Sequence, residues 1–166
     1  MMQDPIPGTS TPDSDMPLDG GRGPVCRVLV PIDSYGASCQ ALGLAIRMGQ
    51  TVRGPLRLVY VRIWDPGARG MGKVFLESSE EATAVLDAAL SWTWACGVEA
   101  SGVVVDAARP LIARAIVQEA SNWGADVIVL TQRPRRFITV GLWDRVAREV
   151  MRATDRPVLV AHPNRA

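Results

Sequence analysis

Arginines gather after a short apolar segment near the end of the chain. They are Arg133, Arg135 and Arg136 in a loop, with Arg145 and Arg148 at the start of the next helical pattern. Guanidinium groups bind phosphates and carboxylates through paired N–H donors, so this cluster could surround an anion. The alternative, which the sequence favours, is a solvated basic loop that pairs with Asp144 and Glu149.

The loop lies where an open α/β sheet usually binds a phosphate. A buried strand is predicted over residues 126–130, and a helix follows the loop. Phosphates bind there because free backbone N–H groups point at them from the turn and from the helix N-terminus. Here the loop begins with Thr131 and reaches Pro134, which has no N–H, and it lacks glycine until Gly141.

Catalytic chemistry has little support. His162 is the only histidine and stands far in sequence from any serine or cysteine that it could activate. The chain has neither a P-loop nor a GxSxG motif. The three cysteines, Cys26, Cys39 and Cys96, form no CxxC or Cys/His cluster, so we expect no metal site and interpret them as buried thiols in a reducing cytoplasm. We predict that the protein is not an enzyme.

Short apolar runs alternate with helical periods from residue 25 onward. The predicted strands are 28–32, 56–63, 98–105, 126–130 and 157–161, and the predicted helices are 37–48, 77–96, 111–123 and 143–153. A glycine-rich loop, 66–72, separates the second strand from its helix. Such alternation predicts a single open, doubly wound, five-stranded parallel sheet with helices on both faces, a Rossmann-like α/β fold. Its ligands bind beyond the carboxyl ends of the strands.

Composition limits the remaining choices. At 166 residues and 48% hydrophobic content, the chain is long enough for one domain, and a net charge of +1 argues against a nucleic-acid binder. Residues 1–24 are rich in Pro, Gly, Ser, Thr and Asp, so we expect a disordered tail followed by a folded domain over 25–166. No segment resembles an export signal or a membrane span, which predicts a cytoplasmic protein without a membrane partner.

Five segments of the chain carry a recognisable pattern. They are VLVPIDSYGASCQAL (28–42), LRLVYV (56–61), GADVIVL (124–130), RVAREV (145–150) and RPVLVA (156–161). In these segments and in their order, which cover the folded domain from about residue 26 to 162, the chain resembles the universal stress protein family. The resemblance implies an adenine nucleotide α-hydrolase-like fold, with ATP as the candidate cofactor.

Members that bind ATP carry G-x-x-G, nine residues, then G-[ST] after the fourth strand. These four places fall on Thr131, Pro134, Asp144 and Arg145, so none is kept. Asp144 would bring a carboxylate to the phosphates; two like charges about 4 Å apart repel by about 4 kcal/mol at an effective dielectric of about 20, which weakens binding roughly a thousandfold. The alternative, which we favour, is that Asp144 caps the last helix.

The adenine side of the resemblance is better preserved. Asp33 matches the aspartate that ends the family's first strand, and Val61 matches an apolar residue that lines the base. Capping of the next helix near Ser38 explains Asp33 equally well. The family's Gly-x-Pro turn before the third helix is replaced by 108–110, Ala-Arg-Pro. The candidate nucleotide-binding residues are Pro31, Asp33, Val61, Leu130, Thr131, Arg133, Pro134, Arg135, Arg136, Asp144, Arg145 and Val146.

The resemblance also implies a homodimer. In the family the last strand pairs with its counterpart in a second subunit, and residues 157–161 would otherwise form an unprotected edge. The prediction is therefore a cytoplasmic dimer that acts by binding in a stress response, with ATP binding weakened or lost. The alternatives are an ATP sensor that replaces glycine contacts by arginine ones, and a protein-interaction module. Trp92 and Trp94 are relevant to the protein-interaction module. They lie about 200° apart on one helix, so they cannot both face the core.

Overall fold

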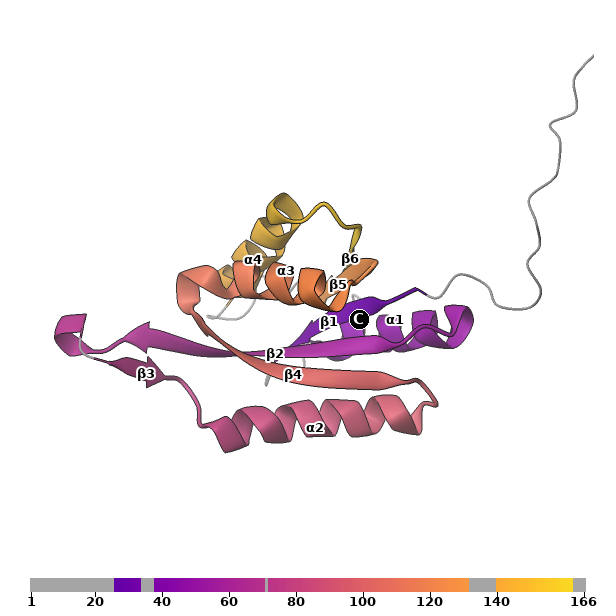
Figure 1. The fold of residues 1–166 in the computed structure, drawn as a ribbon, viewed down its shortest axis with the longest axis horizontal. Helices are drawn as coiled ribbons and strands as arrows, with labels where there is room; N and C mark the ends of the chain where they lie inside the picture. Colours follow the sequence, from indigo (N-terminus) through magenta and orange to yellow (C-terminus); the bar gives the residue numbers. More distant parts are fainter. Residues whose placement is uncertain (1–25, 34–37, 71, 132–139, 163–166) are drawn as a thin grey trace, which may run out of the picture.

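An uninterrupted apolar run forms the central strand of the sheet, β1 (Val28–Ile32). In the computed structural model, which describes residues 26–33, 38–70, 72–131 and 140–162, all five residues of β1 are buried. A strand that is apolar on both sides requires helices on both faces of its sheet. The chain supplies them in alternation with the strands (Figure 1).

The remaining elements follow in chain order. They are α1 (Ser38–Val52), β2 (Leu56–Pro66), a 3₁₀ turn η1 (Ala68–Gly70), β3 (Lys73–Phe75), α2 (Ser79–Ala95), β4 (Ala100–Ala108), a 3₁₀ turn η2 (Arg109–Leu111), α3 (Ile112–Trp123), β5 (Val127–Thr131), α4 (Val140–Ala153) and β6 (Val158–Ala161). This confirms the predicted α/β class with a mostly parallel open sheet.

The order across the sheet is β4-β2-β1-β5-β6, and all these neighbours are parallel. The short β3 pairs antiparallel with the end of β2. Trp64 of β2 pairs with both Ala108 and Phe75, so β3 and β4 lie on opposite edges of β2. The strand order reverses beside β1, which places the switch point between β1 and β5.

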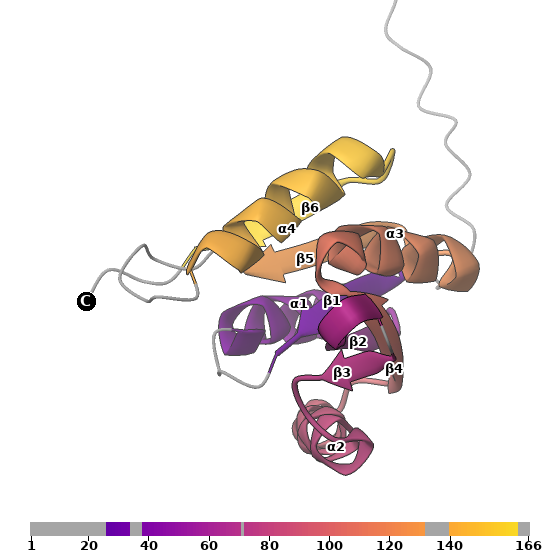
Figure 2. The ribbon, with the colours of Figure 1, turned by 90° about the vertical axis from the view of Figure 1, so that its left-hand side faces the viewer.

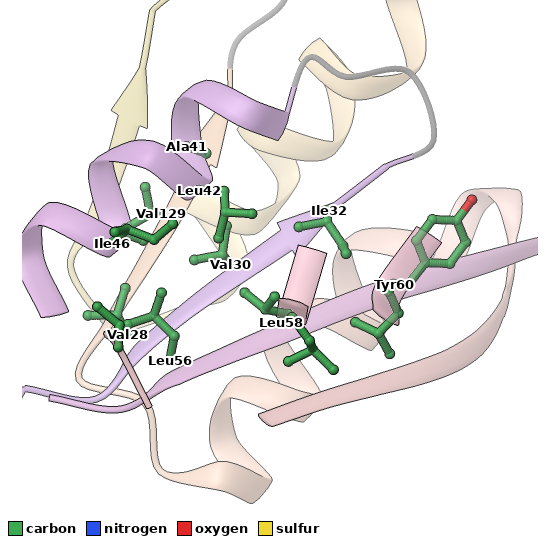
Figure 3. Packing of buried hydrophobic residues seen from close by; sticks show 14 of the residues in the cluster. Val28, Val30, Ile32, Ala41, Leu42, Ile46, Leu56, Leu58, Tyr60 and Val129 are labelled. Carbon is green, nitrogen blue, oxygen red and sulfur yellow. The ribbon is translucent and has the colours of Figure 1, made fainter. Parts of the chain in front are cut away.

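The helices divide between the two faces of the sheet (Figure 2). One core cluster joins α1 and α2 to the sheet and contains Val30, Leu58 and Ile46, as Figure 3 shows. The other joins α3 and α4 to the opposite face and contains Leu29 and Ile116. Complete burial of such a side chain stabilises the fold by about 1.5–3 kcal/mol. The two clusters fix the helices over the sheet and leave its edges for other contacts.

The described residues form six strands, and one of them, β3, was not predicted from the sequence. It is only three residues long and pairs only because β2 runs three residues past its predicted end at Ile63. Gly70 and Gly72, with φ of 73° and 79°, form the turn between the two strands. A segment this short has no periodicity of its own, so the glycine-rich loop was the natural expectation.

Two further expectations about the helices and the thiols were wrong. The last helix begins at Val140, not at residue 143, so Asp144 lies inside the helix and cannot cap it. None of the three cysteines is fully buried: Cys39 is exposed, and Cys26 and Cys96 are half-buried, all as free thiols. Partial burial still raises the pKa of the Cys26 thiol, helped by the charge of Asp126.

We predict opposite effects of alanine at two glycines. An added Cβ at Gly54 would lie 1.9 Å from the carbonyl oxygen of Cys26, whereas one at Gly43 on α1 meets only Arg47 at 3.8 Å. Gly54→Ala should therefore lower the free energy of unfolding by about 1–3 kcal/mol. Gly43→Ala should raise it by about 0.5–1 kcal/mol, because alanine favours the helix. Urea unfolding measures both, and equal effects would contradict the close approach at Gly54.

Candidate functional site

Two neighbouring hollows lie at the carboxyl edge of the sheet. Asp33, which follows β1, and Trp143, in the first turns of α4, line both of them. One hollow opens between β1 and β2 and the other between β1 and β5. The residues that separate and close them therefore come from the end of the central strand and from α4.

The larger hollow, here called the cleft, has a volume of about 170 Å³. Its walls combine apolar side chains with three charged ones. The lining residues are Ile32, Asp33, Tyr60, Val61, Ile63, Leu76, Glu77, Arg109, Leu142 and Trp143. Tyr60 and Val61 are almost completely buried, with exposed fractions of 3% and 4%. The floor of the cleft is thus the part of β2 just beyond the end of β1.

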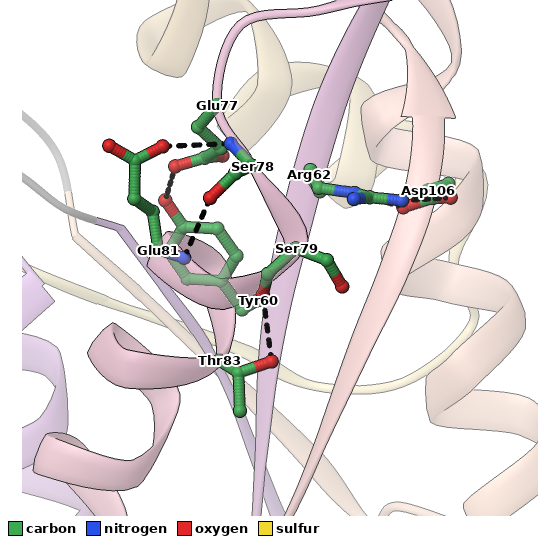
Figure 4. Close-up of polar contacts among 8 residues, drawn as sticks. All are labelled: Tyr60, Arg62, Glu77, Ser78, Ser79, Glu81, Thr83 and Asp106. Carbon is green, nitrogen blue, oxygen red and sulfur yellow. Dashed lines mark hydrogen bonds and ion pairs between the residues drawn. The ribbon is translucent and has the colours of Figure 1, made fainter.

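Helix capping places Glu77 in the cleft (Figure 4). Ser78 is the N-cap of α2: its hydroxyl accepts from the Glu81 N–H, and the Glu81 carboxylate accepts from the Ser78 N–H. Because this reciprocal box starts the helix at Ser79, Glu77 stays outside it and accepts a hydrogen bond from the Tyr60 hydroxyl at 2.5 Å. The expectation that Glu77 lies in the first turn of this helix was wrong. The sequence does contain the signal for the true start, because Ser78-x-x-Glu81 is a capping box.

The backbone of β2 also presents an acceptor to the cleft. The Val28 N–H donates to the Pro55 carbonyl, and the Leu76 N–H donates to the Ile63 carbonyl. Alternate residues of a strand direct their backbone groups to the same side, so Val61 faces the same edge as Pro55 and Ile63. Since β1 pairs with β2 only as far as Ile32 opposite Tyr60, the Val61 carbonyl oxygen faces the space beyond the end of β1.

The smaller hollow occupies the switch point. It has a volume of about 20 Å³ and is lined by Pro31, Asp33, Ser38, Leu130, Thr131, Trp143 and Ala147. A space of this size holds about one water molecule. The crevice where open α/β sheets bind phosphates is therefore narrow here, and Trp143 and Ala147 of α4 are among the described residues that line it.

Asp33 accepts a hydrogen bond from the Ser38 hydroxyl, at 3.4 Å to Oδ1. The same hydroxyl accepts from the Asp33 backbone N–H at 3.2 Å. Asp33 thus contacts the first residue of α1 through side chains, in agreement with the predicted link to Ser38. The N-cap position of α1 lies outside the described residues.

Two polar atoms near the smaller hollow lack hydrogen bonds. Thr131 Oγ1 and Asp144 Oδ1 are buried, and neither has a hydrogen-bond partner in the structure. Thr131 lines the hollow, while Asp144 stands in α4 between Trp143 and Ala147, which also line it. A buried carboxylate oxygen without a partner makes its surroundings unfavourable for another anion. The described residues that line this hollow include no lysine or arginine that could pair with a phosphate.

Arg109 lines the cleft as a neutralised cation. Its Nε and NH2 groups donate to Asp65 at 3.2 and 2.6 Å. These hydrogen bonds hold the pKa of Asp65 below its usual value. A similar pair joins Arg62 to Asp106, where the hydrogen bond also lowers the pKa of the carboxyl. Both pairs cross from β2 to β4 or to the turn that follows β4, so they fix the wall of the cleft.

The predicted site residues fall into five groups. Pro31, Leu130 and Thr131 line the smaller hollow, Val61 lines the cleft, and Asp33 lines both. Asp144, Arg145 and Val146 line neither hollow: Val146 is in the core at 2% exposure. Arg145 pairs with Glu149 at 3.1 Å, which agrees with the ion-pair alternative for these charges. Arg133, Pro134, Arg135 and Arg136 lie outside the described residues.

Eight of the ten described residues that line the cleft are absent from the candidates predicted from the sequence. They are Ile32, Tyr60, Ile63, Leu76, Glu77, Arg109, Leu142 and Trp143. Leu76 and Glu77 approach β2 only through the turn that β3 makes. Within the described ranges, no group of three or more His, Cys, Asp or Glu side chains could hold a metal ion. Among these residues no helix is long and apolar enough to cross a membrane.

Both tryptophans of α2 are outside the core. Trp92 is 42% exposed and Trp94 is 55% exposed. The indole N–H of Trp94 donates to the Ala100 carbonyl at 3.0 Å, which fixes that ring against the start of β4. The prediction that the pair could not share the core is confirmed.

Comparisons with known proteins agree on one family. The model of the universal stress protein family matches residues 25–162. A universal stress protein from Archaeoglobus fulgidus is similar in structure, with a TM-score of 0.62 and 25% identity over 82% of this chain and 98% of that one. A universal stress protein solved in complex with cAMP has a TM-score of 0.63 and 22% identity over 83% and 97% of the two chains. The Archaeoglobus fulgidus protein solved in complex with dAMP has a TM-score of 0.61 and 24% identity over 82% and 97%. No curated protein gave a significant match.

The Asp65–Arg109 pair predicts a pH dependence. The pKa of Asp65 is lower in the folded protein than in the unfolded chain, so the pair stabilises the fold above the unfolded pKa, about 3.9. That contribution is lost as the pH falls through the folded pKa. Arg109→Gln should return the pKa of Asp65 toward its usual value, as measured by carboxyl ¹³C NMR titration. Arg114→Gln on α3 is the control and should leave it unchanged; an unchanged pKa in Arg109→Gln would contradict the assignment.

Proposed function

This chain belongs to the universal stress protein family, and on that premise we propose that it acts by binding, without catalysis, in a cytoplasmic stress response. The ligand we assign to the cleft carries an adenine ring. Relatives that were solved with cAMP and dAMP support an adenine-type ligand. The observation that carries the proposal is the cleft itself, which is lined by Asp33, just after β1, and by Val61, in β2 one residue past the end of β1.

The same proposal assigns only weak binding to ATP. The family's glycine loop is replaced, the switch-point hollow has a volume of only about 20 Å³, and Asp144 has a buried oxygen without a partner. Each of these features opposes a triphosphate. The alternative is an ATP sensor that uses arginines in place of glycines, and it depends on Arg133, Arg135 and Arg136. Thermal unfolding with ATP distinguishes weak binding from this sensor.

We predict a small effect of ATP on thermal stability. If the dissociation constant for ATP–Mg²⁺ is near the millimolar concentration used, linkage raises the free energy of unfolding by only about 0.4 kcal/mol. The midpoint should then rise by about 1–2 °C for a domain of this size. Asp33→Ala should remove the shift, whereas Asp155→Ala, at an exposed carboxylate (93%), should keep it.

A shift of several degrees with ATP would reject weak binding and support the arginine sensor. A shift that survives in Asp33→Ala would place the nucleotide outside the cleft. Trp143 fluorescence gives an independent readout, because its ring lines both hollows.

We also propose that β6 pairs with its counterpart in a second subunit. β6 is an edge strand that pairs only with β5 among the described strands, and Leu159 is 40% exposed. The Pro157 carbonyl accepts from the Ile128 N–H of β5, so residues 158 and 160 direct their backbone groups to the open edge. An edge of this kind favours pairing with another chain.

Proline at one of these outward positions tests the dimer. Val160→Pro should remove an outward N–H without touching the ladder to β5, and it should convert the dimer to a monomer in sedimentation experiments. Val160→Thr keeps the N–H and should remain dimeric. A wild-type chain that is monomeric at micromolar concentration would contradict the proposal.

A protein-interaction role is the second candidate, because Trp92 and Trp94 are both exposed on α2. Large aromatic side chains are enriched at binding interfaces. The two roles are compatible, since the tryptophans do not line the cleft.

A further inference from the structure

The size of the cleft limits its ligand to a small ring system. A dry cavity of about 150 Å³ accommodates one benzene molecule, and sites for drug-sized ligands reach about 300–1,000 Å³. The cleft, at about 170 Å³, therefore has room for a flat heterocycle and little more. Any further part of the ligand must lie toward α4 or in solvent.

The polar groups of the cleft are mainly acceptors. Asp33 and Glu77 line it with Val61, whose carbonyl is directed to the β1 side of β2, while the Tyr60 hydroxyl already donates to Glu77. Among the described residues of the lining, Arg109 is the one cation, and two of its N–H groups are directed to Asp65. A ligand that presents N–H donors satisfies such a surface, and an anionic one does not.

The region beside the N-terminus of α4, where a phosphate attached to the ring would lie, is also unfavourable for an anion. The N-terminus of α4 would by itself attract an anion, because its first N–H groups are free of helix partners. The hollow at the switch point, however, has room for only about one water molecule, and Trp143 lines it. Asp144, in the second turn of α4, adds a carboxylate whose buried Oδ1 has no hydrogen-bond partner in the structure.

From these observations, and resting on the proposed function, we propose that the cleft selects a phosphate-free heterocycle with amino or ring N–H donors over its phosphorylated forms. A purine nucleoside is the natural representative. Asp33, Glu77 and the Val61 carbonyl accept hydrogen bonds from the ring, and Asp144 repels the phosphates that an otherwise identical nucleotide would carry.

Titration calorimetry of the full chain with adenosine, AMP and ATP–Mg²⁺ tests this selection. Adenosine should bind at least about tenfold more tightly than ATP, with AMP in between, since each added negative charge meets the same carboxylates. Asp144→Asn removes one charge at constant size and should reduce the preference for adenosine over ATP by about tenfold. Asp87→Asn, on the exposed side of α2, makes the same change in net charge and should leave the preference unchanged.

The outcomes separate the inference from the proposed function. ATP binding as tight as adenosine binding, or tighter, would overturn the inference and leave the adenine site standing, with the arginines after β5 as the phosphate ligands. An unchanged preference in Asp144→Asn would overturn the role of that residue. If the folded protein, verified by circular dichroism, binds none of the three ligands, both the inference and the proposed adenine site are wrong.

Discussion

The pairing of β1 on both of its edges is the constraint on which the rest of the molecule depends. β1 is bonded to β2 on one side and to β5 on the other, and every one of its residues is buried. Because the strand is short, it ends before β2 does. The residue that follows it, Asp33, is thereby placed between β2 and β5, where it lines both hollows. The cleft and the switch-point hollow are the two spaces that this early end leaves.

α4 decides which of the two spaces remains open. Its first half carries Leu142 and Trp143 over the carboxyl edge, and its later turns pack Val146 and Val150 into the core. Trp143 lines the crevice beside β5 and also the cleft. The helix that would offer its N-terminus to a phosphate in a glycine-loop protein here covers the same place with side chains.

The sequence predicted the architecture because strands such as β1 and β5 are continuous apolar runs, and helices such as α3 have a clear apolar stripe. Such patterns are local. It failed for β3, which exists only through the edge of a longer neighbour, and for the start of α4, because the preceding loop has no helical signal to extend. At the site, Asp33 and Val61 followed from the resemblance. Glu77 and Trp143 could not be placed, since their positions depend on a capping box and on the angle of a distant helix.

The direction of the strands has a practical consequence for how the protein can be attached to other molecules. β1 begins at the amino edge of the sheet, where Arg27 lies over the Trp123 ring at 4.5 Å and its N–H donates to Asp126. The parallel β6 ends with Ala161 at the opposite edge, the same one that carries the cleft. A surface linker or fluorescent label joined before residue 26 therefore starts at the edge away from the cleft, whereas one joined after residue 162 starts at the edge that carries the cleft.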